Sequence, residues 1–354
     1  MIRTPFRPRA ARGAPGILSG PALTPLNLAV ERLAAACPLA PVEELPLAEA
    51  VGLVLAERLV AEVRSHPVAL RAGWAVAAGD TSGASPYGPV PIGSPPIWVV
   101  PGDRLPEGAD AVLPPDAAVT LAGPPAALAE AAPGEGARRQ GEDAVPGTVL
   151  APAGTPLDAL DVAVAREAGL ATARVRRPYL RLLGDTAGGA AADLVRARAR
   201  ALGAVIRDDG DAALAIVLSG SAPPGFEPFF TGLALRPGEP IAGGLIEGRP
   251  VLVVPPRVET ALAAALVLLP ALIAAMSGGR AEPRAERGTL ARKIASQVGL
   301  AEIALLSATE GGLEPTAVGD LSLAAMARAT HFLLLGPESE GFPAGSTVDA
   351  VPLR

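Results

Sequence analysis

The sequence predicts a multidomain α/β plus β protein. Between residues 176 and 279, short fully apolar runs alternate with segments of helical spacing. Such alternation indicates a mostly parallel sheet covered by helices on both faces. Between Val76 and Val119, and again from Arg284 to Leu353, short strand-like segments are separated by frequent Pro and Gly, which predicts two further β regions.

The apolar runs of the central region end at loops that we expect to lie together. The predicted strands are Tyr179–Leu183, Leu214–Leu218 and Val251–Val254, with helices at Ala190–Leu202 and Thr260–Met276. Ligands of open parallel sheets bind beyond the carboxyl ends of the strands. The loops that begin at Gly184, Ser219 and Pro255 are therefore predicted to point at one place.

The remaining elements follow in chain order. Residues 1–25 are rich in Pro and Gly and are expected to form a disordered tail. Further helices are predicted at Asn27–Ala36 and Leu157–Ala168, strands at Val42–Leu47, Val60–Val63 and Ala171–Val175, and a hairpin turn at Gly311-Gly312.

Composition excludes several classes of function. The formal net charge of −6 argues against a nucleic-acid-binding surface, which needs a basic face. The single cysteine, Cys37, excludes a disulfide framework and a thiolate zinc site. His66 and His331 are far apart and lack a ligand-like spacing, so each is expected to be structural or exposed. The only lysine, Lys293, lies outside the central region.

The sequence predicts neither a membrane span nor a targeting signal. The opening residues lack an apolar segment of the kind found in signal peptides, so we expect a cytoplasmic protein. Thr260–Met276 is largely apolar but shorter than the ~20 residues of a typical span, and it contains Pro270. We expect it to be a helix packed on the central sheet.

The order of motifs resembles the molybdopterin molybdotransferase family, which includes MoeA and the E domain of gephyrin. No single motif is specific, but their order along the chain is. The stretches that carry the resemblance are Pro46–Leu59, Gly102–Val112, Arg138–Leu150, Ala153-Gly154-Thr155, Ser219-Gly220 and Arg236-Pro237-Gly238. Members of this family insert molybdate into adenylylated molybdopterin.

The resemblance implies a particular domain organisation and a homodimer. It implies a central molybdopterin-binding-type three-layer α/β domain, an inserted N-terminal β domain and a C-terminal β-barrel domain. The corresponding ranges are a tail at 1–25, a discontinuous linking domain at 26–63 and 134–175, an inserted β domain at 64–133, the α/β domain at 176–279 and the barrel at 280–354. In the family the active cleft lies between subunits.

Several charged or polar positions of the family motifs are altered in this chain. Where the family has D-N-S-A-M-D-G-Y-A, this chain has Pro67–Ala75, with Ala72 in place of the second carboxylate. Pro101 replaces the threonine of T-G-A, and Thr186 stands where S-T-G-D-E has its glutamate. Glu239 reverses the charge of the second lysine of K-P-G-K-P. The loop that resembles P-G-N-P is Pro255–Val258.

Residues that match the family motifs are the candidate site. By resemblance, the ligand-binding candidates are Gly184, Ser219, Gly220, Arg236, Gly238, Arg138, Arg139 and Glu142. Asp185, Asp208 and Asp209 are the catalytic candidates, and Asp208 and Asp209 are also candidate Mg²⁺ ligands. A paired-acid turn such as Asp208-Asp209 is simply solvated in most proteins, and a structural ion pair at the domain junction explains the Arg138-Arg139 motif equally well.

The resemblance, together with the lost charges, implies a function in molybdenum cofactor biosynthesis with weak or no molybdate insertion. The expected ligands are molybdopterin or its adenylylated form, with Mg²⁺ and molybdate as further candidates. Expected partners are a second copy, other molybdenum cofactor biosynthesis proteins or a molybdoenzyme, and neither nucleic acid nor membrane. The alternatives are an active divergent molybdotransferase and a structural dimer that binds no cofactor.

Overall fold

The computed structural model describes residues 22–62, 66–120, 123–142, 144–184, 189–207, 210–279 and 284–353. Most of the predicted tail at 1–25 lies outside these ranges. The chain divides into two compact units, which are described separately. Unit 1 comprises Met1–Leu39, Pro178–Met276 and Ala281–Arg354, and unit 2 comprises Ala40–Arg177 and Ser277–Arg280.

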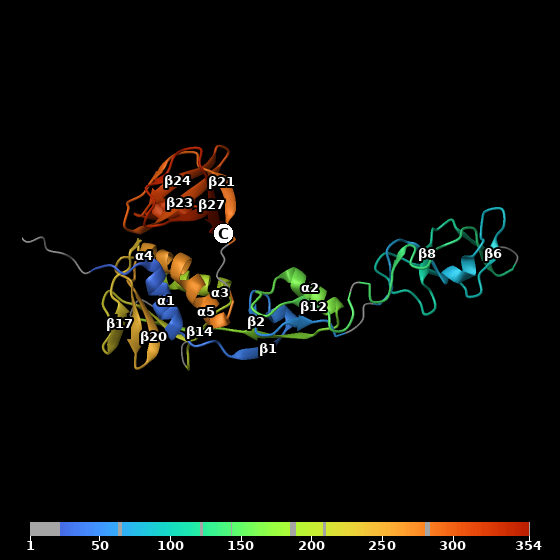
Figure 1. The fold of residues 1–354 in the computed structure, drawn as a ribbon, viewed down its shortest axis with the longest axis horizontal. Coiled ribbons are helices and arrows are strands. Elements are labelled where there is room, and N and C mark those ends of the chain that lie inside the picture. Colours follow the sequence, from blue (N-terminus) through green and yellow to red (C-terminus); the bar gives the residue numbers. More distant parts are fainter. Residues whose placement is uncertain are drawn as a thin grey trace, which may run out of the picture. The chain divides into compact units, whose positions relative to one another are not determined.

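The centre of unit 1 is a six-stranded sheet with the order β15-β14-β16-β20-β19-β17 (Figure 1). The strands are β14 (Tyr179–Leu183), β15 (Val205–Arg207), β16 (Leu214–Leu218), β17 (Phe226–Phe230), β19 (Ala242–Ile246) and β20 (Arg249–Val254). β15, β14, β16 and β20 are parallel, whereas β19 and β17 continue the sheet antiparallel. The three predicted apolar strands are confirmed, and they are neighbours in the parallel half.

The helices next to this sheet pack on one face. They are α1 (Leu26–Ala36), α3 (Ala190–Ala201), α4 (Val258–Ala263), the π-helical segment η3 (Ala264–Leu268) and α5 (Leu269–Ser277). One core joins their apolar side chains to Leu180, Ile216 and Leu252 of the sheet. The core on the opposite face contains strand residues such as Val217 and Val251 and no helical residue. For the described part of the chain, the prediction of helices on both faces, in three layers, is therefore wrong.

Short connections explain the uneven coverage of the sheet. A helical crossover between parallel strands needs about a dozen residues or more. The links at 208–213, between β15 and β16, and at 219–225, between β16 and β17, are both shorter than that. The second link leads past β20 and β19 to β17 without forming a helix.

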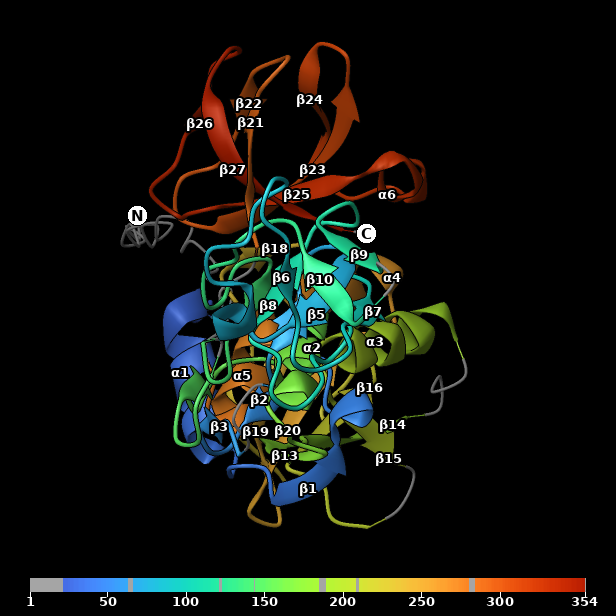
Figure 2. The same cartoon turned by 90° about the vertical axis from the view of Figure 1, so that its right-hand side faces the viewer.

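The helical segment Val258–Ser277 belongs to the core of unit 1. At 20 residues and a mean hydropathy of 2.2, it is long and apolar enough to cross a membrane, but 72% of its most apolar stretch is buried in the protein. The predicted packing on the central sheet is thus confirmed, with the helix starting two residues earlier than predicted. Figure 2 shows the helices between the sheet and the C-terminal strands.

The C-terminal part of unit 1 is a strongly curved sheet. Its strands are β18 (Leu235–Arg236), β21 (Glu286–Thr289), β23 (Ala301–Thr309), β24 (Gly312–Val318), β25 (His331–Leu335) and β27 (Thr347–Pro352), and helix α6 (Leu323–Arg328) belongs to the same part. β22 (Ile294–Ala295) and β26 (Gly341–Phe342) pair with each other in a separate two-stranded sheet. The main order is β18-β23-β25-β27-β21, and β24 also pairs with β23. A bridge between Leu290 and Leu313 brings the two ends of the sheet together. The predicted hairpin turn at Gly311-Gly312 joins β23 to β24.

Unit 2 begins with two small sheets and one α-helix around an apolar core. The elements are β1 (Val42–Pro46), η1 (Leu47–Glu49), β2 (Val54–Leu55), β3 (Leu59–Val60), β12 (Val149–Ala151), α2 (Ala159–Glu167) and β13 (Thr172–Arg176). The side chains of Asp158 and Asp161 cap the start of α2 reciprocally, which satisfies two backbone N–H groups. Leu47, Leu157 and Val175 lie at the centre of this core.

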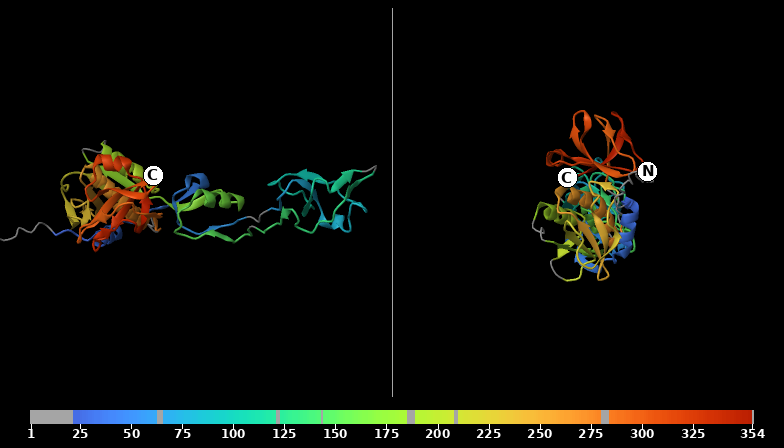
Figure 3. Two further views of the ribbon diagram at one scale, coloured as in Figure 1. Left: turned by 90° about the horizontal axis from the view of Figure 1, so that it is seen from above. Right: turned by 90° about the vertical axis from the view of Figure 1, so that its left-hand side faces the viewer.

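The rest of unit 2 is an all-β segment with its own cores, as predicted for this region (Figures 1 and 3). Its elements are β4 (Val68–Ala69), β5 (Gly73–Val76), η2 (Ala78–Thr81), β6 (Val90–Pro91), β7 (Ile97–Val99), β8 (Ala111–Leu113), β9 (Ala118–Thr120), β10 (Pro125–Ala127) and β11 (Ala137–Arg138). Its strands form the small sheets β7-β5-β8, β6-β10-β9 and β11-β4.

Candidate functional site

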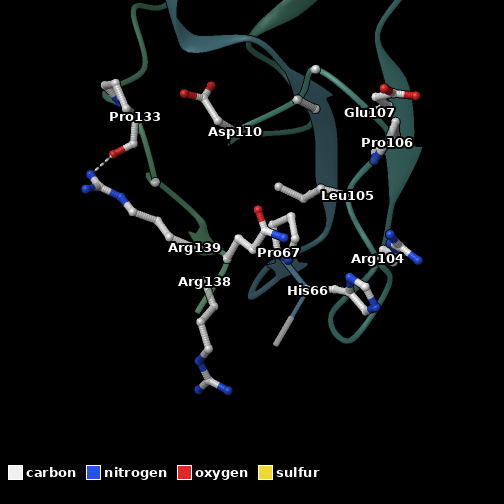
Figure 4. Close-up of a pocket in the computed structure, with 14 residues that line it drawn as sticks. His66, Pro67, Arg104, Leu105, Pro106, Glu107, Asp110, Pro133, Arg138 and Arg139 are labelled. Carbon is white, nitrogen blue, oxygen red and sulfur yellow. Dashed lines mark hydrogen bonds between the residues drawn. The ribbon is translucent and has the colours of Figure 1, made fainter. Parts of the chain in front are cut away.

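An open cavity of about 980 Å³ lies in the all-β segment of unit 2 (Figure 4). Four basic side chains line it, and we call them the basic cluster: His66, Arg104, Arg138 and Arg139. Two carboxylates, Glu107 and Asp110, also line it. The Asp110 carboxylate accepts a hydrogen bond from the backbone N of Ala78 (2.7 Å), which gives it a structural role.

Three chain segments converge to form the cavity because their backbones are hydrogen-bonded together. β4 pairs with β11, which places Val68 opposite Arg138. On the other side of β4, Val68 forms an antiparallel bridge with Arg104, and the N of Leu105 donates to the O of Pro67 (2.9 Å). The arginines of two distant motifs therefore flank the same strand.

A tight turn fixes Arg139 and Glu142. The Glu142 carboxylate accepts from the backbone N of Arg139 (2.8 Å), and the N of Glu142 donates to the O of Arg139 (3.1 Å). The Arg139 guanidinium donates to the carbonyl of Pro133 and lies against Gly134, where a side chain would collide with it. Glu142 thus shapes the loop that holds Arg139.

Arg138 and Arg139 point in different directions from adjacent positions (Figure 4). Arg139 reaches toward Pro133, whereas Arg138 extends away from Asp110. Arg138, His66 and Arg104 also line a second cavity of about 760 Å³. The basic cluster therefore lies along two adjoining hollows.

Arg71 and Trp74, in the stretch that resembles the family's acidic motif, make structural contacts. Arg71 donates from Nε to the carbonyl of Val112 (2.9 Å) and pairs with Glu135 (3.2 Å). A hydrogen bond from the Ala132 backbone, assisted by Arg71, lowers the pKa of Glu135. Trp74 donates to the carbonyl of Pro115 (3.1 Å) and meets Trp98 edge to face, with the ring centroids 5.1 Å apart.

In unit 1, the carboxyl ends of β14, β16 and β20 meet at one edge, as predicted. Gly184 approaches Leu218 so closely that a side chain there would collide with the Leu218 carbonyl oxygen. The N of Ser219 donates to the carbonyl of Val254 (3.1 Å), and the Ser219 hydroxyl accepts from the N of Ser221 (3.2 Å). Gly220 is exposed and has open space around its Cα.

The three catalytic and metal candidates, Asp185, Asp208 and Asp209, lie outside the described residues. Within the described ranges, no group of three His, Cys, Asp or Glu side chains is arranged to hold a metal ion.

Arg236 and Gly238 belong to a different structural setting from the strand ends of the central sheet. Arg236 lies in β18, beside β23 of the C-terminal sheet, and donates from Nε to Glu239 (2.9 Å) and from Nη1 to Gln297 (3.1 Å). The carboxylate of Glu302, which is 5% exposed, lies 3.7 Å from the same Nη1. The backbone N of Gly238 donates to Glu239 (3.0 Å).

The contact between Arg236 and Glu239 is close enough to shift the pKa of both side chains. The hydrogen bond to Glu239 raises the pKa of Arg236. Burial by itself would raise the pKa of Glu239, but hydrogen bonds from the backbone and from Arg236 outweigh burial, and the pKa is lowered. The guanidinium that was expected to bind the ligand is therefore engaged by carboxylates of its own chain.

Two members of the basic cluster, His66 and Arg104, were not predicted as site residues. His66 was expected to be structural or exposed, and it is exposed. Arg104 lies within Gly102–Val112, one of the stretches that carries the family resemblance, and that was the available signal. Its position opposite Arg138 depends on pairing across β4, which the sequence alone does not specify.

Comparison with known proteins places the chain among MoeA proteins in fold. Residues 24–169 match the family model described as the MoeA N-terminal region (domain I and II). No curated protein matches the sequence. The crystal structure of a molybdopterin biosynthesis moeA protein from Pyrococcus horikoshii OT3 is similar, with a TM-score of 0.71 and 22% identity over 94% of this chain and 100% of that one.

A molybdenum cofactor biosynthesis protein from Pyrococcus furiosus is also similar, with a TM-score of 0.61 and 18% identity over 94% of this chain and 100% of that one. At these identities the likeness shows the fold. The N-terminal match and the similarity over nearly the whole length agree with the order of motifs, and the chain has a MoeA-like fold.

Proposed function

We propose that this MoeA-like protein acts in molybdenum cofactor biosynthesis by binding molybdopterin or its adenylylated form, with weak or no insertion of molybdate. The observation that carries the proposal is the cavity of about 980 Å³ lined by the basic cluster. Guanidinium groups bind phosphate oxygens through charge-assisted, often bidentate hydrogen bonds. A cavity of this size matches those that hold cofactor-sized ligands.

The basic cluster provides a local positive region in a protein of net charge −6. Arg139 is held in place by Pro133 and the Glu142 turn, so little side-chain freedom is lost when its remaining N–H groups bind an anion. Arg104 has no carboxylate partner among the described residues, and its charge is available to a ligand.

The proposal of weak or no insertion rests on missing charges. Ala72 and Pro101 supply no carboxylate or hydroxyl where the resembling family motifs have them. The Arg236 guanidinium is occupied by Glu239 and Glu302.

Titration of the purified full-length protein with molybdopterin and with adenylyl-molybdopterin, with and without Mg²⁺ and molybdate, tests the proposal. We expect binding without release of AMP. Arg104→Ala and Arg139→Ala should each weaken binding about tenfold or more, because each removes a charged hydrogen-bond donor. Arg166→Ala, an exposed arginine of α2 outside the cavity lining, is the matched control and should bind like the wild type.

The outcomes separate the three functions under consideration. Molybdate-dependent AMP release would show an active molybdotransferase and contradict the second half of the proposal. If neither form of the ligand binds, the proposal is wrong and a structural role remains. Equal weakening by Arg166→Ala would show that binding does not depend on the cavity.

A further inference from the structure

Unit 1 contains an apolar groove of about 420 Å³ that takes no part in the proposed function. It lies between α3, the helical segment that starts with α4, and the C-terminal residues near α6. Its walls are mainly aliphatic and include Leu194, Leu262, Leu266, Met326 and Leu353. Its volume is in the range of pockets that hold small organic ligands.

Among the described residues that line this groove, Arg198 in the last turn of α3 carries the only charged side chain. Its Nε atom is buried and has no hydrogen-bond partner within the described ranges. Burial also lowers the pKa of the guanidinium, because the charged form is poorly solvated there. The C-terminal end of a helix favours a cation but provides no acceptor for Nε. A desolvated donor without an acceptor is unfavourable unless a ligand supplies one.

The opposite wall of the groove is locally irregular. Ala265 and Leu266 belong to the π-helical segment η3, which lies just before Pro270. Pro270 has no backbone N–H, so the carbonyl of Leu266 cannot receive the usual α-helical hydrogen bond. Single π-helical turns within α-helices frequently occur at functional sites. The widened turn presents Ala265, a small residue, to the groove.

We propose that this groove binds a small amphipathic carboxylate, with its aliphatic chain against the apolar walls and its carboxylate on Arg198. The walls exclude a strongly polar ligand, because burying unpaired polar groups there would be unfavourable. The single arginine selects a single negative charge at one end of the ligand. A guanidinium also matches the two oxygens of a carboxylate geometrically.

Isothermal titration of the full-length protein with decanoate, and with decanol as its uncharged analogue, tests this inference. We expect decanoate to bind about tenfold more tightly than decanol, since the charged hydrogen bond is absent from the alcohol. Arg198→Met keeps the length and apolar stem of the side chain. It should remove the preference for decanoate while decanol still binds, which also shows that the groove is intact.

Two control variants complete the experiment. Arg200→Met changes an exposed arginine on the same helix outside the groove and should preserve the preference. Ala201→Leu adds bulk at the exposed rim and should weaken both ligands. Equal affinity for decanoate and decanol, unchanged decanoate affinity in Arg198→Met, or no binding of either compound would overturn the inference. None of these outcomes bears on molybdopterin binding, which involves unit 2.

Discussion

Gly184→Ala is expected to destabilise unit 1 strongly, although the family resemblance would assign Gly184 a role in ligand binding. Gly184 has φ = +121°, a conformation that residues with a side chain rarely adopt. An added Cβ would collide with the carbonyl oxygen of Leu218 and lie 3.1 Å from its carbonyl carbon and 3.2 Å from its nitrogen. These atoms belong to the backbone of a central strand and cannot move independently.

Two contributions determine how much Gly184→Ala lowers the free energy of unfolding. Forcing a residue with a side chain into such a conformation costs about 1–3 kcal/mol. Displacing Leu218 also disturbs the neighbouring hydrogen bond from the N of Ser219 to the carbonyl of Val254, worth about 1 kcal/mol. A loss of about 3 kcal/mol lowers the unfolding midpoint of a unit of this size by roughly 6–12 °C.

Gly220→Ala is the matched control. Gly220 lies two residues after Leu218, was also a ligand-binding candidate, and has no atom within 4 Å of an added Cβ. Its substitution should change stability by less than about 0.5 kcal/mol. Scanning calorimetry of the full chain compares the two variants with the wild type. Equal midpoints for Gly184→Ala and Gly220→Ala would refute the argument that the close approach to Leu218 requires glycine.

Three further predictions concern other parts of the chain. Thr81→Val should lower the stability of unit 2 by about 1–3 kcal/mol in urea titration, because valine leaves the carbonyl of Ala78 and the backbone N of Ala131 without this partner. The buried Thr81 hydroxyl donates to the carbonyl of Ala78 (2.8 Å) and accepts from the N of Ala131 (2.9 Å), so an unchanged urea midpoint would contradict the prediction. The lowered pKa of Glu239 stabilises the fold at pH values above the pKa of an unfolded glutamate, near 4.3. The stability difference between the wild type and Glu239→Gln should therefore shrink as the pH falls below about 4, and a difference that stays constant with pH would contradict this prediction. Burial raises the pKa of Cys37 to about 12, so a thiol reagent at pH 8 should label this residue only after the protein unfolds. Rapid labelling of the folded protein would show that the Cys37 thiol is accessible and would contradict the prediction.

The strands of the central sheet were predictable because their signal is local. An apolar run such as Leu214–Leu218 that ends at Ser-Gly already specifies a buried strand and its end. Coverage of the sheet was not predicted correctly, because it depends on where successive strands lie. The link at 219–225 has to pass two strands, β20 and β19, to reach β17, and it is too short to do so with a helix.

The candidate site was predictable only where the motifs are continuous in sequence. Arg138, Arg139 and Glu142 lie in one stretch, and the resemblance identified them together. The pairing of Arg236 with Glu302 joins residues far apart in sequence, and no local pattern indicates it. The environment of Arg198 was likewise not predictable from the sequence. The sequence of α3 is that of an ordinary amphipathic helix, and only the tertiary structure buries the Nε atom of Arg198.

The retained and altered motif positions differ in their physical role. Gly73 and Gly184 match glycines of the resembling family, and at both positions a side chain would collide with a neighbouring strand, at Leu113 and Leu218 respectively. At Ala72 and Glu239, by contrast, the difference from the resembling family motifs is one of charge.

Two arginines that lie in the altered family motifs are paired with groups of their own chain. Arg71 contacts the carbonyl of Val112 and the carboxylate of Glu135, and Arg236 contacts the carboxylates of Glu239 and Glu302. An arginine whose donors are already paired has little left to offer a phosphate, because binding a ligand would first require breaking those bonds. Anion binding by this protein should therefore depend on the basic cluster of unit 2. Arg236→Ala should leave the affinity for molybdopterin unchanged, whereas Arg104→Ala should reduce it.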